Sequence, residues 1–189
     1  MSVKSKIILS LFVLSSLILI PSCENKDKSQ NNGKITISLT DAADSLSKVL
    51  VDIQSVDVHY AANDTDTLAS DTTSGWVTLN SNAGVYNLTE LQNGIEKVIA
   101  TGELPAGHVT QIRLKLGSDN SLVIPGDTLS LAVPGATQTG IKINYDNDIV
   151  PDKQLNILLD FNLQESIIVR GLGVAKLNPV IKVKSSTYD

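Results

Sequence analysis

The chain has little of what many enzyme sites are built from: one cysteine, two histidines and 4% aromatic residues among 189. One cysteine excludes an internal disulfide, so stability must come from apolar packing. Two histidines without a third candidate ligand make a poor zinc site. No Gly-x-Ser-x-Gly elbow and no phosphate-binding glycine loop occurs. These absences favour a non-enzymatic protein, and we expect neither a cofactor nor a bound metal.

Positive charge is also scarce, because 15 Lys and Arg face 20 Asp and Glu, a formal net charge of −5. The chain shows no basic cluster, which excludes nucleic acid as an expected partner. The low aromatic content leaves no aromatic strip for a polysaccharide, and this argues against a dedicated carbohydrate-binding module.

Only one long apolar run is present, Ile7–Ile20, preceded by Lys4 and Lys6. As a helix, its 14 residues would span about 21 Å, short of the roughly 30 Å hydrocarbon core of a bilayer. The run therefore predicts a removable signal, residues 1–22, rather than a membrane-spanning helix. Its removal takes away two lysines and no acid, which lowers the net charge from −5 to −7.

The sequence Ile20-Pro21-Ser22-Cys23 resembles a lipobox, the cleavage and lipidation signal of bacterial lipoproteins. The resemblance implies fatty acyl chains such as palmitate on Cys23, and two or more chains anchor a protein stably. We expect an outer-membrane lipoprotein, on the surface or the periplasmic face; Glu24 and Asp27 are compatible with the surface. The alternative is an ordinary secretory signal followed by an incidental cysteine. Residues 23–33 read as a disordered tether.

Residues 34–185 read as one all-β domain, because apolar and polar residues alternate along several short segments. The alternation slips by one between Ile53 and Val56, which predicts a β-bulge near Gln54-Ser55. Arg113 and Lys115 alternate with core positions and are expected to face solvent. The positions expected to face the core include Ile35, Ile37, Leu39, Ile112, Leu114, Leu159 and Phe161.

Turn signals separate these segments, among them Asn93-Gly94, Pro125-Gly126-Asp127 and Asn147-Asp148. Short strands at this spacing predict a sandwich or a barrel. A last strand is expected over Leu177–Val183, starting at a sheet edge because of Pro179.

Several segments together form a recognisable pattern: Gly33–Ala42 (GKITISLTDA), Trp76–Leu79, Tyr86–Gly94, Leu104–Leu114, Leu159–Asn162 and Leu177–Ile181. This pattern resembles a family of bacterial lipoprotein domains, domain of unknown function 4382. Ala43 departs from the pattern, which often has proline there. The Leu104-Pro105-Ala106-Gly107 step is also similar to transthyretin-like and Cna-B-like domains. The resemblance implies a single Greek-key β-sandwich, transthyretin-like or immunoglobulin-like, at the cell envelope, and no activity.

Candidate site residues are few. Asp146 and Asp148, like Asp64 and Asp66, place oxygens two residues apart as calcium loops do, but lack the glycine and glutamate of such loops. We interpret them as solvated acids. His59 and His108 are expected at the surface or at strand ends.

Three further residues carry a structural interpretation with a functional alternative. Asp41 is expected to form an Asx turn or to cap a helix near Ala42, and Asp160 shares a landmark position of the family pattern. Trp76 is expected in the core, and a sugar-binding ring is the alternative.

Thr67 and Thr72 lie in Asp-Thr motifs similar to an O-glycosylation sequon of exported bacterial proteins. The sequence as a whole favours a lipid-anchored binding or interaction module with an unidentified envelope or extracellular partner. The alternatives are an envelope hydrolase that uses a carboxylate pair, and a subunit of a surface assembly that adds strands.

Overall fold

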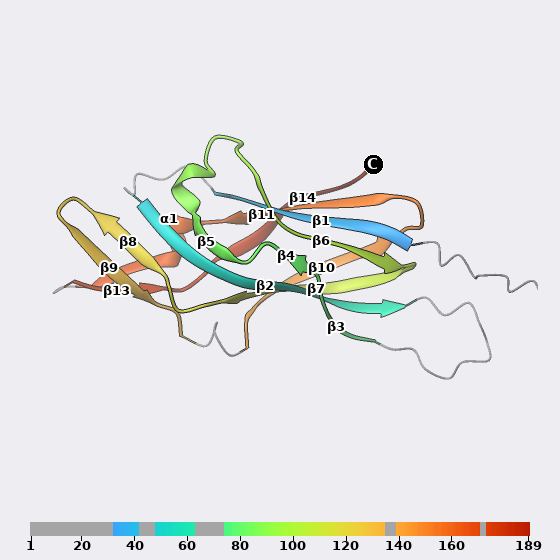
Figure 1. Ribbon diagram of the computed structural model, residues 1–189, viewed down its shortest axis with the longest axis horizontal. Helices are drawn as coiled ribbons and strands as arrows, with labels where there is room; N and C mark the ends of the chain where they lie inside the picture. The colour runs from blue at the N-terminus through green and yellow to red at the C-terminus, as the bar shows by residue number, and fades with distance from the viewer. Residues whose placement is uncertain (1–31, 42–47, 63–73, 135–138, 171–172) are drawn as a thin grey trace, which may run out of the picture.

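The computed structural model describes residues 32–41, 48–62, 74–134, 139–170 and 173–189. Within them the chain forms two β-sheets packed face to face in an elongated sandwich (Figure 1). The predicted all-β sandwich is therefore confirmed. The described strands run from Asn32 to Tyr188.

The first sheet has five strands in the order β14-β11-β1-β6-β4. Strands β1 and β11 pair in parallel, Leu39 opposite Leu159, and the other neighbours are antiparallel. Because β1 and β11 are far apart in sequence, their pairing ties the two ends of the domain together. The strands are β1 (Asn32–Asp41), β4 (Asn80–Ser81), β6 (Lys97–Pro105), β11 (Gln154–Phe161) and β14 (Ile181–Tyr188).

The second sheet has nine strands. Seven are linked in the order β10-β7-β2-β8-β9-β13-β12. Strands β7 and β8 pair with one edge of β2, and β3 and β5 pair with the other edge. They are β2 (Lys48–Ala62), β3 (Ser74–Thr78), β5 (Gly84–Asn87), β7 (Gly107–Leu116), β8 (Ser121–Ile124), β9 (Asp127–Ala132), β10 (Ile141–Ile149), β12 (Ile167–Arg170) and β13 (Val174–Leu177). Two short helical turns complete the described part, η1 (Leu88–Glu90) and α1 (Leu163–Ser166).

The core lies between the sheets and is built from aliphatic side chains that alternate along the strands. The core positions expected from the alternation are at most 1% exposed, namely Ile35, Ile37, Leu39, Ile112, Leu114, Leu159 and Phe161. Burial of such side chains is the main stabilising contribution in a domain without a disulfide.

The long strand β2 contains the predicted bulge. Its register against β7 shifts between Ile53 and Ser55, and the inward side chains change from odd to even positions at that point. Val51 and Val58 are both fully buried as a result. An extra residue in one strand is what allows both halves of β2 to face the same core.

Two expectations about strand boundaries are wrong. The last predicted strand is divided, because β13 ends at Leu177 and β14 begins at Ile181 in the other sheet. Asn147-Asp148 is not a turn but part of β10, where the register against β7 shifts between Asn144 and Asn147. The bulge lies at Tyr145-Asp146, and Asn147 and Asp148 resume the pairing with Val109 and His108, so the strand does not end there.

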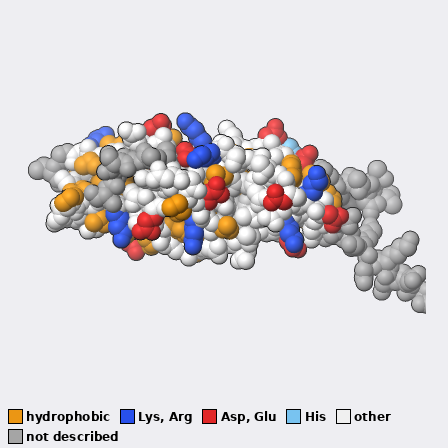
Figure 2. Space-filling model, turned by 90° about the horizontal axis from the view of Figure 1, so that it is seen from above, with side chains coloured by type: hydrophobic (Ala, Val, Ile, Leu, Met, Phe, Trp, Pro, Cys, Tyr) orange, Lys and Arg blue, Asp and Glu red, His pale blue; other side chains and the backbone are white. Residues whose placement is uncertain are grey.

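Figure 2 views the molecule from above, onto the side on which β1, β6 and β14 lie in Figure 1. Acidic and basic side chains are interspersed on this side, with no cluster of one sign. Among the described residues, no helix has the length and apolar character needed to cross a membrane.

Candidate functional site

The outer face of the second sheet carries polar and aromatic side chains in two cross-strand rows. Trp76 of β3 lies opposite His59 of β2, and Asp57 of β2 lies opposite Arg113 of β7. Arg113 in turn lies opposite Lys142 of β10. We call these five residues the Trp76 face. Side chains directly opposite on one face of a sheet are close enough to interact.

An ion pair lies at the centre of the Trp76 face. Asp57 is fully buried, and its Oδ2 accepts hydrogen bonds from Arg113 Nε at 2.8 Å and Nη2 at 2.5 Å. Thr78 donates its hydroxyl to the other carboxylate oxygen, and Lys115 Nζ is 3.4 Å from Oδ2. The Arg113 side chain is 17% exposed, so the expectation that it faces solvent is wrong.

The surroundings of Asp57 keep it ionised. Burial alone would raise the pKa of this carboxyl, but the hydrogen bonds from Arg113 and Thr78 and the charges of Arg113 and Lys115 outweigh burial and lower it. The stability that Asp57 contributes is therefore present above the ordinary carboxyl pKa and is lost as the pH falls through the lowered one.

Trp76 covers this ion pair instead of joining the core, so its expected core position is also wrong. The ring centroid lies 4.0 Å from the guanidinium carbon of Arg113, a cation–π contact. The side chain is partly exposed. The alternation along β3 indicates this outward position of Trp76. Val77 and Leu79 alternate with Trp76 and Thr78, and Leu79 is a core residue.

The neighbours of Trp76 fix its orientation. The His59 ring meets the indole edge-on, with centroids 5.3 Å apart and planes at 74°. His59 Nδ1 is itself 2.9 Å from the Thr110 hydroxyl. Gly140, at φ +72°, lies against Arg113, and a Cβ there would come 2.7 Å from Arg113 Cγ. Glycine at this position thus leaves room for the arginine stem beneath the ring.

Lys142 is the exposed cation of the Trp76 face. Its Nζ lies 5.7 Å from the Trp76 centroid, and the residue is exposed. Within the described ranges, no carboxylate lies within ion-pair distance of this ammonium group. The face therefore combines a fixed aromatic ring with a cation that remains available to a ligand.

A second polar cluster connects β7, β10 and β14. His108 binds Asp146 through Nε2 at 2.8 Å and Asp148 through Nδ1 at 2.7 Å. The Tyr188 hydroxyl donates to the backbone oxygen of Asp148 at 2.7 Å. The expected solvated acids Asp146 and Asp148 thus share one histidine near the start of β7, where His108 was expected at a strand end.

The His108 cluster predicts a pH dependence of stability. The hydrogen bond to Asp148 raises the pKa of His108 above its usual value of 6.5, and both carboxylate charges act in the same direction, against a smaller effect of burial. A raised pKa means that the stabilisation is complete below 6.5 and is lost as the pH rises through the folded value.

We expect the wild type to lose stability relative to His108→Gln between pH 6 and pH 8.5, by less than about 1 kcal/mol because the groups are exposed. Urea unfolding of both proteins at these two pH values measures the difference. A wild type that gains stability relative to the variant over this range would contradict the prediction.

The other acids have structural positions. Asp41 is 2% exposed; its Oδ1 accepts from the Leu163 backbone N–H at 3.3 Å and its Oδ2 from Gln92 Nε2 at 3.2 Å. It therefore holds the start of α1. The expected Asx turn or cap of a helix near Ala42 falls on residues 42–47, which lie outside the described part. Asp160 lies on β11, partly exposed, opposite Thr40 and Lys182.

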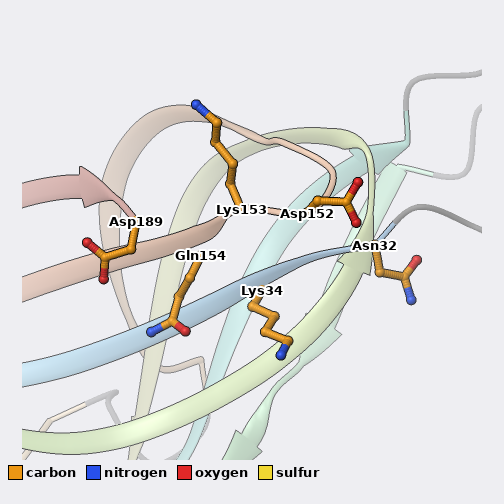
Figure 3. Close-up of a pocket in the computed structure, with 6 residues that line it drawn as sticks. All are labelled: Asn32, Lys34, Asp152, Lys153, Gln154 and Asp189. Atoms are coloured by element: carbon orange, nitrogen blue, oxygen red, sulfur yellow. The ribbon is translucent and has the colours of Figure 1, made fainter.

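A cavity of about 360 Å³ lies where β1 and β11 begin, next to the end of β14 (Figure 3). Figure 3 shows the Lys34 and Lys153 side chains pointing in opposite directions, so the two cations do not converge on one ligand position. Across the described ranges, no three His, Cys, Asp or Glu side chains are grouped to hold a metal ion. The residues that line the cavity are Asn32, Lys34, Asp152, Lys153, Gln154 and Asp189.

Several predicted site residues lie outside the described residues. They are the lipidation residue Cys23, the glycosylation candidates Thr67 and Thr72, and the acids Asp64 and Asp66.

Comparison with protein-family models identifies the family of this chain. Residues 32–179 match the family described as domain of unknown function (DUF4382), so the chain belongs to this family. The match covers both sheets up to the end of β13. No curated protein and no solved structure matches the chain. The likeness to transthyretin-like or immunoglobulin-like domains therefore remains a prediction.

Proposed function

We propose that this protein is a non-enzymatic, lipid-anchored binding module of the bacterial outer membrane, with the Trp76 face as its ligand-binding side. The observation that carries the binding role is the position of the only tryptophan in the chain. It lies outside the core, fixed between Arg113 and His59, on the outer face of a sheet. Partly exposed aromatic side chains fixed among polar groups are typical of binding surfaces.

The lipid anchor is proposed from the sequence around Cys23. Strand β1 begins at Asn32, about nine residues after Cys23, and a chain of that length reaches at most about 30 Å. An acylated Cys23 would therefore hold the domain close to the bilayer, with the N-terminal end of β1 nearest to the lipid. Figure 1 places this end of β1 at one end of the long axis of the sandwich.

The anchor predicts an all-or-none change in location. Cys23→Ser should remove the attachment point of the acyl chains, and the protein should move from the membrane fraction to the soluble fraction. Ser22→Ala, which keeps a small residue before Cys23, serves as the control and should leave the protein in the membrane. Cell fractionation with a carbonate wash measures both. A Cys23→Ser protein that stays in the washed membrane would refute the anchor.

The binding role has its own test, because Trp76 is the only tryptophan and the tryptophan emission of the lipid-free domain therefore reports on this face. We expect a saturable change in this emission with at least one of the separated polysaccharide, lipid and protein fractions of the envelope. If none of the three fractions produces such a change, the Trp76 face is not a binding surface.

A further inference from the structure

We propose that the Trp76 face binds an acidic carbohydrate, with a sugar ring stacked on Trp76 and a sugar carboxylate paired with Lys142. The inference rests on the proposed binding function and names its ligand class. It begins from the ring: the Arg113 guanidinium lies over the indole, 4.0 Å from its centroid, and the side chain remains partly exposed. The face of an aromatic ring is electron-rich, so it attracts the slightly positive C–H groups of a pyranose.

The ring is held in place before any ligand arrives. Asp57 fixes the Arg113 guanidinium by two hydrogen bonds, and Arg113 supports Trp76 from below. His59 contacts the edge of the indole and is bonded to Thr110. A binding group that is already rigid loses little conformational entropy when its ligand binds.

Charge selects an acidic sugar over a neutral one. Arg113, Lys115 and Lys142 lie on neighbouring positions of β7 and β10, and Asp57 is the described carboxylate within ion-pair distance of two of them. Lys142 Nζ lies over the Trp76 ring, 5.7 Å from its centroid, and no described carboxylate lies within ion-pair distance of it. A carboxylate on a sugar ring stacked over Trp76 can reach this ammonium group.

The neighbouring row supplies hydrogen-bonding groups for hydroxyls. Gln111 of β7 lies opposite His59 on one side and Asn144 of β10 on the other. Gln111 Nε2 donates to Asn144 Oδ1 at 3.3 Å, which leaves the Asn144 amide nitrogen as a donor for a ligand. A single ring with polar neighbours suits one sugar residue of a chain, in agreement with the lack of an aromatic strip in this sequence.

Acidic groups border the site without entering it. Asp146 and Asp148 bind His108, and Asp52, further along β2, accepts from Gln54 Nε2 at 2.5 Å. Since the whole chain carries a net charge of −5, an acidic polymer is repelled outside this patch. Binding of a single sugar unit should therefore be weak.

The test uses the fluorescence of the sole tryptophan. Oligogalacturonate is titrated into the lipid-free domain, with neutral dextran and polyglutamate as separate arms. We expect a saturable change in Trp76 emission with oligogalacturonate, and a response at least tenfold weaker with dextran, which lacks the carboxylate, and with polyglutamate, which lacks the sugar ring. No saturable response to oligogalacturonate, or an equal response to either control polymer, overturns the proposal.

Two variants assign the interaction to residues. Lys142→Ala should weaken oligogalacturonate binding about tenfold or more, while Lys184→Ala, an exposed lysine on β14 of the other sheet, should leave it unchanged. Trp76→Leu, measured by calorimetry with circular dichroism as the folding control, should abolish it. Equal affinity of Lys142→Ala and Lys184→Ala overturns the proposal. Since the envelope fractions test binding by any ligand, a failure with oligogalacturonate alone leaves the proposed binding function standing.

Discussion

Arg113→Met is expected to destabilise the domain by about 3 kcal/mol, because it leaves the fully buried Asp57 carboxylate without its main partner. Methionine keeps most of the volume of the arginine stem, so the loss reports on the charge more than on packing. The figure lies at the lower end for breaking a buried pair, since Lys115 and Thr78 remain next to Asp57. Urea unfolding followed by far-ultraviolet circular dichroism measures it without relying on Trp76.

Two further variants separate the ion pair from other effects. Lys115→Ala should cost less than about 1 kcal/mol, since the Lys115 side chain is 38% exposed and its Nζ comes no closer than 3.4 Å to the Asp57 carboxylate. Adding Asp57→Asn to Arg113→Met should restore part of the lost stability, because no buried charge is then left unpaired. Equal losses of stability for Arg113→Met and Lys115→Ala would show that the buried Asp57–Arg113 ion pair contributes no more than the exposed contact with Lys115.

The side chains that face the core could be predicted from the sequence because a period of two is a local property. Ile35, Ile112 and Phe161 follow it and are at most 1% exposed. The slip between Ile53 and Val56 marked the bulge in β2 for the same reason, since a one-residue shift must be absorbed where it occurs.

The composition of the Trp76 face could not be predicted in the same way. Asp57 and Arg113 are 56 residues apart, and their pairing depends on β7 lying next to β2. The alternation places both on the outer face, and for Arg113 this predicts contact with solvent. They are covered because Trp76 reaches them from β3, on the far side of β2. Contacts across three strands follow from strand order, which no local pattern contains.

The pairing of β1 with β11 was also beyond local reasoning. Parallel strands need a long crossover, and here nearly the whole domain lies between Asp41 and Gln154. The consequence is that Asp41, at the end of β1, meets the start of α1 just after β11. Its structural role could be foreseen, but its partner Leu163 could not.

Leu159→Ala is expected to cost about 2–5 kcal/mol, the usual range for removing a buried leucine. Leu159 is fully buried on β11, opposite Leu39 of β1 and Val183 of β14. The strands on both sides are hydrogen-bonded to β11, so they cannot close the cavity without breaking sheet pairing. A poorly collapsing site places the cost in the upper half of the range.

Leu158→Ala is the matched control for this variant, because it removes the same atoms one position away on the opposite face. Leu158 is partly exposed, opposite Ser38 of β1 and Ser185 of β14. Its truncation should cost well under half as much as that of Leu159, since little buried volume is lost. Chemical unfolding of the two variants side by side decides which face of β11 is turned to the core. Equal losses at Leu158 and Leu159 would mean that β11 does not present one face to the core, and the sandwich as described would then be wrong at the strand that joins β1 to β14.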